Sequence, residues 1–289
     1  LPISWFLTLP LALVAAAAYL RLFMIGHDCT HRSYLPTRWQ NNALGNIIGV
    51  LTNTPLEYWG NQHAKHHRTT GNLDRRGAGD VTMLTVVEYQ QAGRWARIWY
   101  RIYRNPFMLM FVFAPIYFIF MLRWPFEHER PTRAIWLSVL GTNLGVGIYY
   151  GVMIWAFGLV PFLLVYGPVV WLSSVGAVWL FYMQHQFDDT YWARDDAWSY
   201  HDATLYGSSF YDLPRLLHWA SGNIGYHHIH HLNPRIPNYK LADCFASSPA
   251  VQNATHITFS QSLRLAMLAL WDEDQKRLIS FGEYRRRYL

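Results

Sequence analysis

Residues 134–183 read AIWLSVLGTNLGVGIYYGVMIWAFGLVPFLLVYGPVVWLSSVGAVWLFYM, and this segment decides the fold. It consists of two apolar runs, Ala134–Phe157 and Val160–Met183, separated by a Gly-Leu pair. Each run is long enough to cross about 30 Å of hydrocarbon as a helix. The glycine at the junction and Pro161 just beyond it favour a tight turn. The segment therefore predicts a hairpin of two membrane-spanning helices, 134–157 and 160–183.

The rest of the chain contains a third apolar run of spanning length, residues 3–25. Two weaker runs, 43–59 and 107–122, are shorter or interrupted by Gly and Pro, and we expect them to be helices lying in the membrane interface. Only 15% of residues are charged, whereas soluble domains average about 25%. The 14 Trp and 19 Tyr fit interfacial aromatic belts. We predict an all-α integral membrane protein, with residues 1–289 forming a single domain.

Charge and chain ends place further limits on the protein. The net charge is +6, but there is no dense Lys/Arg tract or nucleic-acid motif, so nucleic-acid binding is not expected. Seven arginines in the polar segment 63–104 place that segment on the cytoplasmic side. The chain begins at Leu1 without Met and lacks the basic start of a signal peptide. We expect the natural protein to have further residues before it.

Histidine is the unusual residue type, with 14 copies, most of them in three clusters. The motifs are HDCTH, HAKHH and HHIHH, and their spacings of three and four residues place side chains on one face of a helix. His228 would point away from that face. The candidate ligands are His27, His31, His63, His66, His67, His227, His230 and His231.

Three such clusters predict a metal site with two ions. A tetrahedral zinc needs about four ligands, so eight imidazoles are too many for one ion. Imidazole suits Zn, Cu, Fe and Ni, so the pattern alone leaves the metal open. If the clusters form one site, an even number of crossings separates His63 from His227. Three apolar runs lie between them, so we expect the shortest, 107–122, not to cross.

The order H-x-x-x-H, H-x-x-H-H, H-x-x-H-H resembles the membrane fatty acid desaturase superfamily. The chain is most similar to bacterial acyl-lipid desaturases of the delta-12/omega-6 or omega-3 type. The resemblance is carried by GHDCTHRSY (26–34), HAKHHRTTGNLD (63–74), GDVTMLTVVEY (79–89), FYMQHQFDDTYW (181–192) and GNIGYHHIHHLNPRIPNYKL (222–241). Such proteins usually have four spans, and we attribute the difference to missing N-terminal residues.

The resemblance implies a cytosolic helical cap that holds two non-haem iron ions, with O2 as co-substrate. The eight clustered histidines would be ligands. The family uses one more histidine, for which His185 is the first candidate and His201 the second. Asn223 would contact a metal through water. Aspartates near the motifs are candidates to orient ligand histidines: Asp28, Asp80 and Asp188, with Asp74 and Asp189 also near in sequence.

The implied activity is insertion of a cis double bond into an acyl chain, using O2 and two electrons from outside. No flavin, nicotinamide, haem or iron–sulfur motif is present in the sequence, so a separate donor of the ferredoxin, rubredoxin or cytochrome b5 type is expected. The substrate would be a membrane lipid or another acyl carrier. The expected location is the bacterial inner membrane, with the metal site on the cytoplasmic side. The alternative is a hydroxylase or ketolase of the same superfamily acting on a carotenoid, alkane or other lipid.

Overall fold

Three long apolar helices organise the computed structural model, which describes residues 5–77, 79–126 and 130–289. They are α1 (Trp5–Thr30), α7 (Arg133–Phe157) and α8 (Leu159–Met183), and each is long and apolar enough to cross a membrane. The start of the predicted first span, residues 3–4, lies outside the described residues. The helix continues beyond the predicted end at residue 25, which places His27 in its last turn and His31 directly after it.

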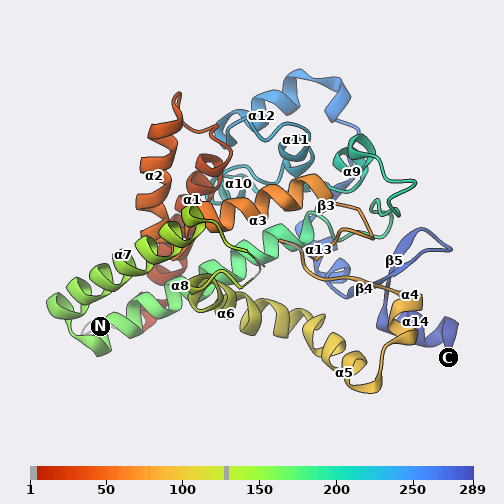
Figure 1. Cartoon of the computed structure of the whole chain (residues 1–289), viewed down its shortest axis with the longest axis horizontal. Helices are drawn as coiled ribbons and strands as arrows, with labels where there is room; N and C mark the ends of the chain where they lie inside the picture. Colours follow the sequence, from red (N-terminus) through yellow and green to blue (C-terminus); the bar gives the residue numbers. More distant parts are fainter. Residues whose placement is uncertain (1–4, 78, 127–129) are drawn as a thin grey trace.

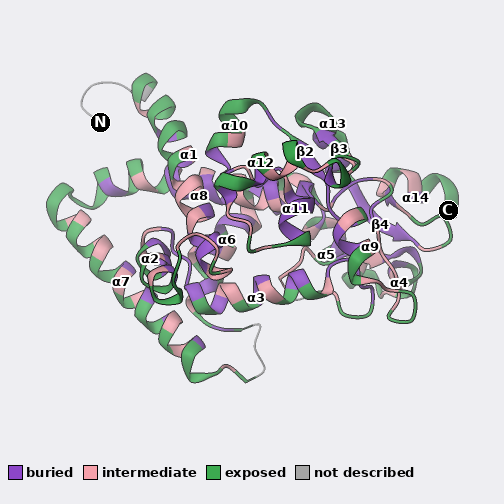
Figure 2. Ribbon diagram, turned by 90° about the horizontal axis from the view of Figure 1, so that it is seen from above, coloured by how far each residue is buried: buried purple, intermediate pink, exposed green. Residues whose placement is uncertain are grey.

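The structure contains a helical hairpin where the sequence predicts one: α7 and α8 are antiparallel and meet at Gly158 (Figure 1). That both helices cross a membrane stays a prediction. Gly158 has φ 84°, a conformation that side chains with a Cβ rarely adopt. At its other end α7 is capped by Thr132, whose hydroxyl oxygen accepts a hydrogen bond from the Ile135 amide. Most of the α7 surface is exposed although it is apolar (Figure 2); Trp155, for example, is 88% exposed. Such a surface is what a helix in contact with lipid would present.

The prediction of one interfacial helix over residues 43–59 is wrong. The segment belongs to two helices, α2 (Arg38–Leu51) and α3 (Leu56–Thr69), joined by a buried turn. Asn53 in that turn has a left-handed φ of 56°, and Pro55 precedes the first residue of α3. Proline disfavours a helical conformation in the residue before it, so Pro55 favours the break between the two helices. Helix α2 packs against α1 and α7, and α3 packs against α7.

Residues 107–122 are helical, as predicted, but irregular. They form a π-helical turn, η1 (Met108–Phe113), then α6 (Ala114–Ile119) and the 3-10 turn η2 (Met121–Arg123). The preceding helix, α5 (Arg94–Tyr103), meets this segment at an angle of 76°. Trp171 of α8 donates a hydrogen bond to the Phe111 carbonyl, so the segment packs beside a long apolar helix. Its predicted place in the interface stays a prediction.

The remaining residues form short elements around the ends of the long helices. The helices are α4 (Val86–Gln91), α9 (Tyr200–Tyr206), α10 (Arg215–Ala220), α11 (His227–Leu232), α12 (Asn238–Ser247), η3 (Pro249–Val251), α13 (Phe259–Leu265) and α14 (Phe281–Tyr288).

The prediction of an all-α fold needs correction, because the chain also contains two small sheets. Strand β4 (Leu268–Asp272) pairs in parallel with β1 (Leu84–Thr85) and antiparallel with β5 (Arg277–Ser280). Strands β2 (Phe210–Asp212) and β3 (His256–Thr258) form a parallel pair. All five residues of β4 are buried, and the first four are apolar, a pattern that suits a central strand. The fold is therefore mostly helical.

Candidate metal centre

The three histidine motifs lie on three different helices that meet at one place. His27 lies on the last turns of α1, and His31 follows directly after that helix. The second motif is on α3 and the third is on α11. In Figure 1, α3 and α11 lie close to the end of α8, from which His185 follows after one residue. The tertiary structure thus collects residues separated by up to about two hundred positions.

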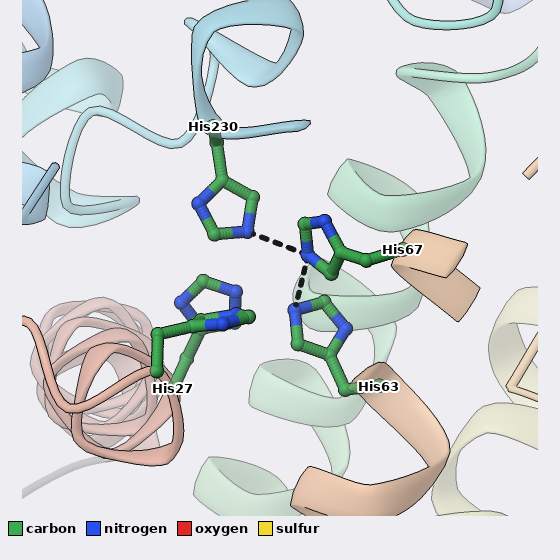
Figure 3. Close-up of side chains that lie close together, drawn as sticks. His27, His63, His67 and His230 are labelled. Atoms are coloured by element: carbon green, nitrogen blue, oxygen red, sulfur yellow. Dashed lines mark hydrogen bonds between the residues drawn. The ribbon is translucent and has the colours of Figure 1, made fainter. Parts of the chain in front are cut away.

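Five histidines form the first group, which we call group one: His27, His31, His63, His67 and His230. One ring nitrogen from each lies within 4.8 Å of those of the others. Figure 3 shows rings from the three motifs turned toward one another. The Nε2 atom of His67 lies 3.0 Å from Nε2 of His63 and 3.0 Å from Nε2 of His230.

Four histidines form the second group, group two: His66, His185, His227 and His231. The Nε2 atom of His231 lies 3.0 Å from that of His227 and 3.2 Å from that of His66. His227 Nε2 lies 3.0 Å from His185 Nε2. The two groups include all nine predicted histidines, and each of the H-x-x-H-H motifs contributes to both groups.

These spacings fit shared metal ions. Two imidazoles bound at right angles to one ion, at about 2.1 Å each, have nitrogens about 3.0 Å apart. Burial also keeps the rings neutral, which is the form that binds metal. It lowers the pKa of His63, His67 and His230 well below the ordinary value, and that of His185 to about 3. The donor set therefore suits two ions, each held by imidazole.

Neighbouring groups orient three of the histidines. His27 Nδ1 lies 3.0 Å from Asp28 Oδ1, and His66 Nδ1 contacts Asp80 Oδ1. His185 Nδ1 donates a hydrogen bond of 2.7 Å to the Gly207 carbonyl. When Nδ1 carries the proton, Nε2 presents a lone pair to a metal. In each case Nε2 is then the atom left free to face the group's interior.

Other predicted residues have different partners in the structure. His201 is exposed and pairs with Asp202 at 3.5 Å. The Asp188 carboxylate lies 2.7 Å from the guanidinium of Arg264, and Asp74 forms an ion pair with Arg194. His228 points out of both groups, as predicted, with Nε2 2.9 Å from the Val251 carbonyl.

Asn223 has a local role that its sequence position did not suggest. Its φ is 58°, a left-handed conformation that asparagine tolerates better than most residues. Its side-chain amide donates a hydrogen bond of 3.2 Å to the Asn238 carbonyl. The water-mediated contact with a metal stays a prediction.

Sequence reasoning missed Asn238. Its backbone amide and side-chain amide donate hydrogen bonds of 2.6 and 2.9 Å to Asp28 Oδ2. Because the other oxygen of Asp28 faces His27, Asn238 fixes the carboxylate that orients a group-one histidine. The only available signal was its position in the segment 222–241, shared with the resembled family.

An apolar cavity of about 320 Å³ opens onto both histidine groups. His27 and His63 of group one and His227 of group two contribute to its wall. Most of the remaining wall is hydrocarbon or aromatic, supplied by α1, α3, α6, α8 and η1; representative residues are Phe23, Trp59, Leu109, Phe118 and Val178. A long apolar ligand in this cavity would therefore lie beside both groups.

These features define a class: mostly helical proteins with candidate membrane-spanning helices, in which histidines at helix ends form sites able to hold metal ions. The family model described as "Fatty acid desaturase" matches residues 3–261. A "Fatty acid desaturase" of Bacillus subtilis is 44% identical over 281 residues, covering 97% of this chain and 79% of the relative.

Two cyanobacterial relatives are more distant. An "sn-1 oleoyl-lipid 12-desaturase" of Picosynechococcus is 27% identical, covering 84% of this chain and 69% of its own. An "sn-1 acyl-lipid omega-3 desaturase (ferredoxin)" of Synechocystis is 29% identical, covering 82% and 66% respectively. The chain belongs to the fatty acid desaturase family. It is an oxidoreductase that acts on fatty acids.

Proposed function

We propose that this protein is an acyl-lipid desaturase that inserts a cis double bond at a di-iron centre held by the two histidine groups. The observation that carries the proposal is the apolar cavity, because its wall includes histidines of both groups. A methylene pair in the cavity would lie next to the site of oxidation. Relatives named as acyl-lipid desaturases support this substrate class.

The overall reaction would combine one saturated –CH2–CH2– unit, O2, two electrons and two protons to give –CH=CH– and two waters. Iron would supply the activation of O2, which no side chain can perform alone. The protein's residues would bind and orient: nine histidines as ligands, Asp28 and Asp80 on their outer nitrogens, and aromatic walls that exclude water from the acyl chain.

The electrons would come from a separate protein of the ferredoxin, rubredoxin or cytochrome b5 type. A relative whose name specifies ferredoxin supports the first of these. We propose that the site faces the cytoplasm from the bacterial inner membrane, with residues 107–122 in the interface. Cysteines replacing Trp155 and His201, in a Cys244→Ser background, would then react with an impermeant reagent from opposite sides. Labelling of both from the same side contradicts this topology.

The activity is tested by expression in a host that lacks desaturases, followed by lipid analysis and metal analysis of the purified protein. We expect a new unsaturated fatty acid and about two irons per chain. The His67→Ala variant, which removes a group-one histidine, is the inactive control. An oxygenated product would instead support the hydroxylase or ketolase alternative. Active protein that holds zinc alone would overturn the di-iron proposal.

A further inference from the structure

Helix α5 carries an exposed apolar face although it is too short to cross a membrane. The residues of this face follow one another at spacings of three and four positions: Trp95, Ile98, Trp99 and Ile102. Trp95 is 78% exposed. Arg94 and Arg97 lie beside this face on the helix. A helix with tryptophan on one side and arginine next to it is typical of segments that lie in a membrane interface.

Helices α10 and α13 also expose apolar side chains. On α10 the exposed residues are Leu216, Leu217 and Trp219, and the first of these is 74% exposed. Two exposed residues on α13 lie four positions apart, and a third follows the helix: Phe259, Leu263 and Met267. None of the sequences of α5, α10 and α13 contains Asp or Glu.

Contacts with the long helices hold α10 and α13 beside the candidate spans. The guanidinium carbon of Arg21 on α1 lies 4.6 Å from the centre of the Trp219 ring on α10. The ring of Phe259 on α13 lies 6.5 Å from the ring of Trp179 on α8, measured between centroids. Both exposed faces therefore lie next to helices that are long and apolar enough to span.

Helix α5 is connected to α8 through η1. The ring of Trp99 lies 5.7 Å from that of Phe113, and the ring of Phe111 lies 5.3 Å from that of Trp171 on α8. Phe113 and Tyr103 also line the apolar cavity. The exposed face of α5 is thus separated from the cavity by a single layer of aromatic side chains.

The charges on these helices favour an anionic surface as their partner. Arg94, Arg97 and Arg215 form no ion pair with an acidic side chain in the part of the chain that the structure describes. By contrast, Arg75 and Arg76 pair with Asp195 and Glu88, respectively. Exposed arginines beside apolar side chains, without neighbouring carboxylates, match a leaflet with anionic head groups.

We propose that the exposed apolar faces of α5, α10 and α13, which we call the collar, lie in the interface of one membrane leaflet and contact anionic lipid. The proposal rests on the membrane location that is part of the proposed function. Attachment of the collar to α1 and α8 favours lipid over a protein partner, because lipid surrounds any helix that spans the membrane. The three helices then belong to the interface and not to the aqueous cap.

The collar also fixes the height of the metal centre above the leaflet. His27 follows Arg21 by six residues on α1, a rise of about 9 Å. The histidine groups therefore lie just beyond the level at which Arg21 and Trp219 meet the lipid surface. An acyl chain that belongs to a lipid of this leaflet has a short path to the apolar cavity, along the wall that contains Tyr103 and Phe113.

The first test measures contact with lipid by fluorescence quenching. The variants Trp99→Cys, Leu217→Cys and Leu263→Cys, each in a Cys244→Ser background, receive a bimane label. Cys29 stays in place because it is 1% exposed. The labelled full chain is placed in vesicles of phosphatidylethanolamine and phosphatidylglycerol with brominated acyl chains. We expect the bromine to lower the fluorescence of all three collar labels by about twofold or more, because interfacial side chains reach the acyl boundary.

Matched controls use exposed aromatic residues outside the collar. Tyr206→Cys on α9 and Tyr239→Cys on α12 replace side chains that are 59% and 51% exposed, and both helices lie on the other side of α3 from α5 (Figure 1). Their labels should keep their fluorescence. Collar labels that are quenched no more than these two overturn the proposal. If Trp99→Cys does not fold, Trp95→Cys tests the same face.

A label at Trp155→Cys on α7 separates this proposal from the location on which it rests. That residue is 88% exposed on a candidate span, so its label should be quenched strongly. Quenching at α7 without quenching at the collar contradicts the collar alone. A label on α7 that is not quenched contradicts the proposed membrane location as well. Neither readout requires enzyme activity.

The second test concerns the lipid charge. The Leu217→Cys label is compared in vesicles that contain brominated phosphatidylglycerol or brominated phosphatidylcholine at the same mole fraction. We expect about twofold stronger quenching by the anionic lipid, because each arginine near the surface attracts it. The triple variant Arg94→Gln, Arg97→Gln and Arg215→Gln should lose this preference. Equal quenching of the wild-type arginine set by the two lipids overturns the assignment to anionic lipid.

Discussion

The position of each histidine within its helical turn determines the group it joins. His63 and His67 are four residues apart, so they differ by about 40° around α3, whereas His66 is about 100° from His67. The first two accordingly belong to group one and His66 to group two. The same spacing on α11 sends His227 and His231 to group two and His230 to group one. Each H-x-x-H-H motif therefore bridges the two groups.

His185 should be the ninth ligand. We expect His185→Ala to lower the metal content of the purified protein, with the loss confined to one of the two ions, because group two would retain only three histidines. His201→Ala is the control, since that side chain is exposed and lies in neither group. Metal counting on both variants checks this. Equal metal content in the two would show that His185 is not a ligand.

Asp80 should matter more than Asp188 for metal retention. Asp80 contacts the outer nitrogen of His66, whereas Asp188 pairs with Arg264 on the surface. Loss of such an orienting carboxylate typically weakens metal binding by about 10- to 100-fold. We therefore expect Asp80→Asn, but not Asp188→Asn, to release metal at lower chelator concentration in a competition titration. If Asp188→Asn released metal at the lower chelator concentration, the orienting role would belong to Asp188 and not to Asp80.

At the scale of elements, close packing of Gly79 against α3 holds the second motif in place. A Cβ on Gly79 would lie 2.6 Å from the Gln62 carbonyl oxygen and 3.3 Å from His66 Cβ. Gly77 also has a positive φ, 101°, but nothing lies within 4 Å of its Cβ position. The two glycines therefore differ in packing but share a positive φ, which a residue with a Cβ would adopt only with strain.

This difference gives a matched pair of variants. Gly77→Ala should cost about 1 kcal/mol through backbone strain alone. Gly79→Ala should cost more and also lower the metal content, because α3 must move to relieve the contact. Thermal unfolding and metal analysis of both variants check this expectation. It fails if the two alanine variants have the same melting temperature and the same metal content.

Helix α5 shows how an element's surface depends on the fold around it. Its arginines led to a cytoplasmic assignment, yet Trp95, Ile98, Trp99 and Ile102 form an exposed apolar stripe. The spacing of three and four residues places them on one face. Arg101 on another face lies against Phe281 of α14. Helix α5 thus has an exposed apolar face in addition to the face on which Arg101 packs against α14.

At the scale of the whole molecule, the buried histidines of the two groups make stability depend on pH. Burial lowers the pKa of His185 to about 3, and lowers those of His63 and His230 well below normal, while an unfolded histidine titrates near 6.5. Below about pH 6.5 the unfolded chain therefore binds more protons than the folded one, so stability rises with pH.

We consequently expect metal-free protein to melt at a lower temperature at pH 5.5 than at pH 7.5. Differential scanning calorimetry on protein stripped with chelator measures the shift. The His201→Ala variant should show the same shift, since that exposed residue lies outside both groups. A melting temperature that is independent of pH in this range would mean that the histidines are not buried in the folded metal-free protein.

The sequence by itself determined the three long helices, the hairpin at Gly158 and the nine histidines that the structure brings together. These features are local: helix length, a turn glycine and motif spacing can be read without knowing what packs against them. It also indicated Asp28 and Asp80 as neighbours of ligand histidines, because each lies close to a motif in the chain.

Only the tertiary structure decided how those residues are used. It divided the histidines into two groups, paired Asp188 with Arg264, placed Asn238 on Asp28 and split residues 43–59 into two helices. It also formed the apolar cavity that opens onto both histidine groups. Each of these depends on contacts between residues far apart in the chain, and such contacts have no periodic signal in a single sequence.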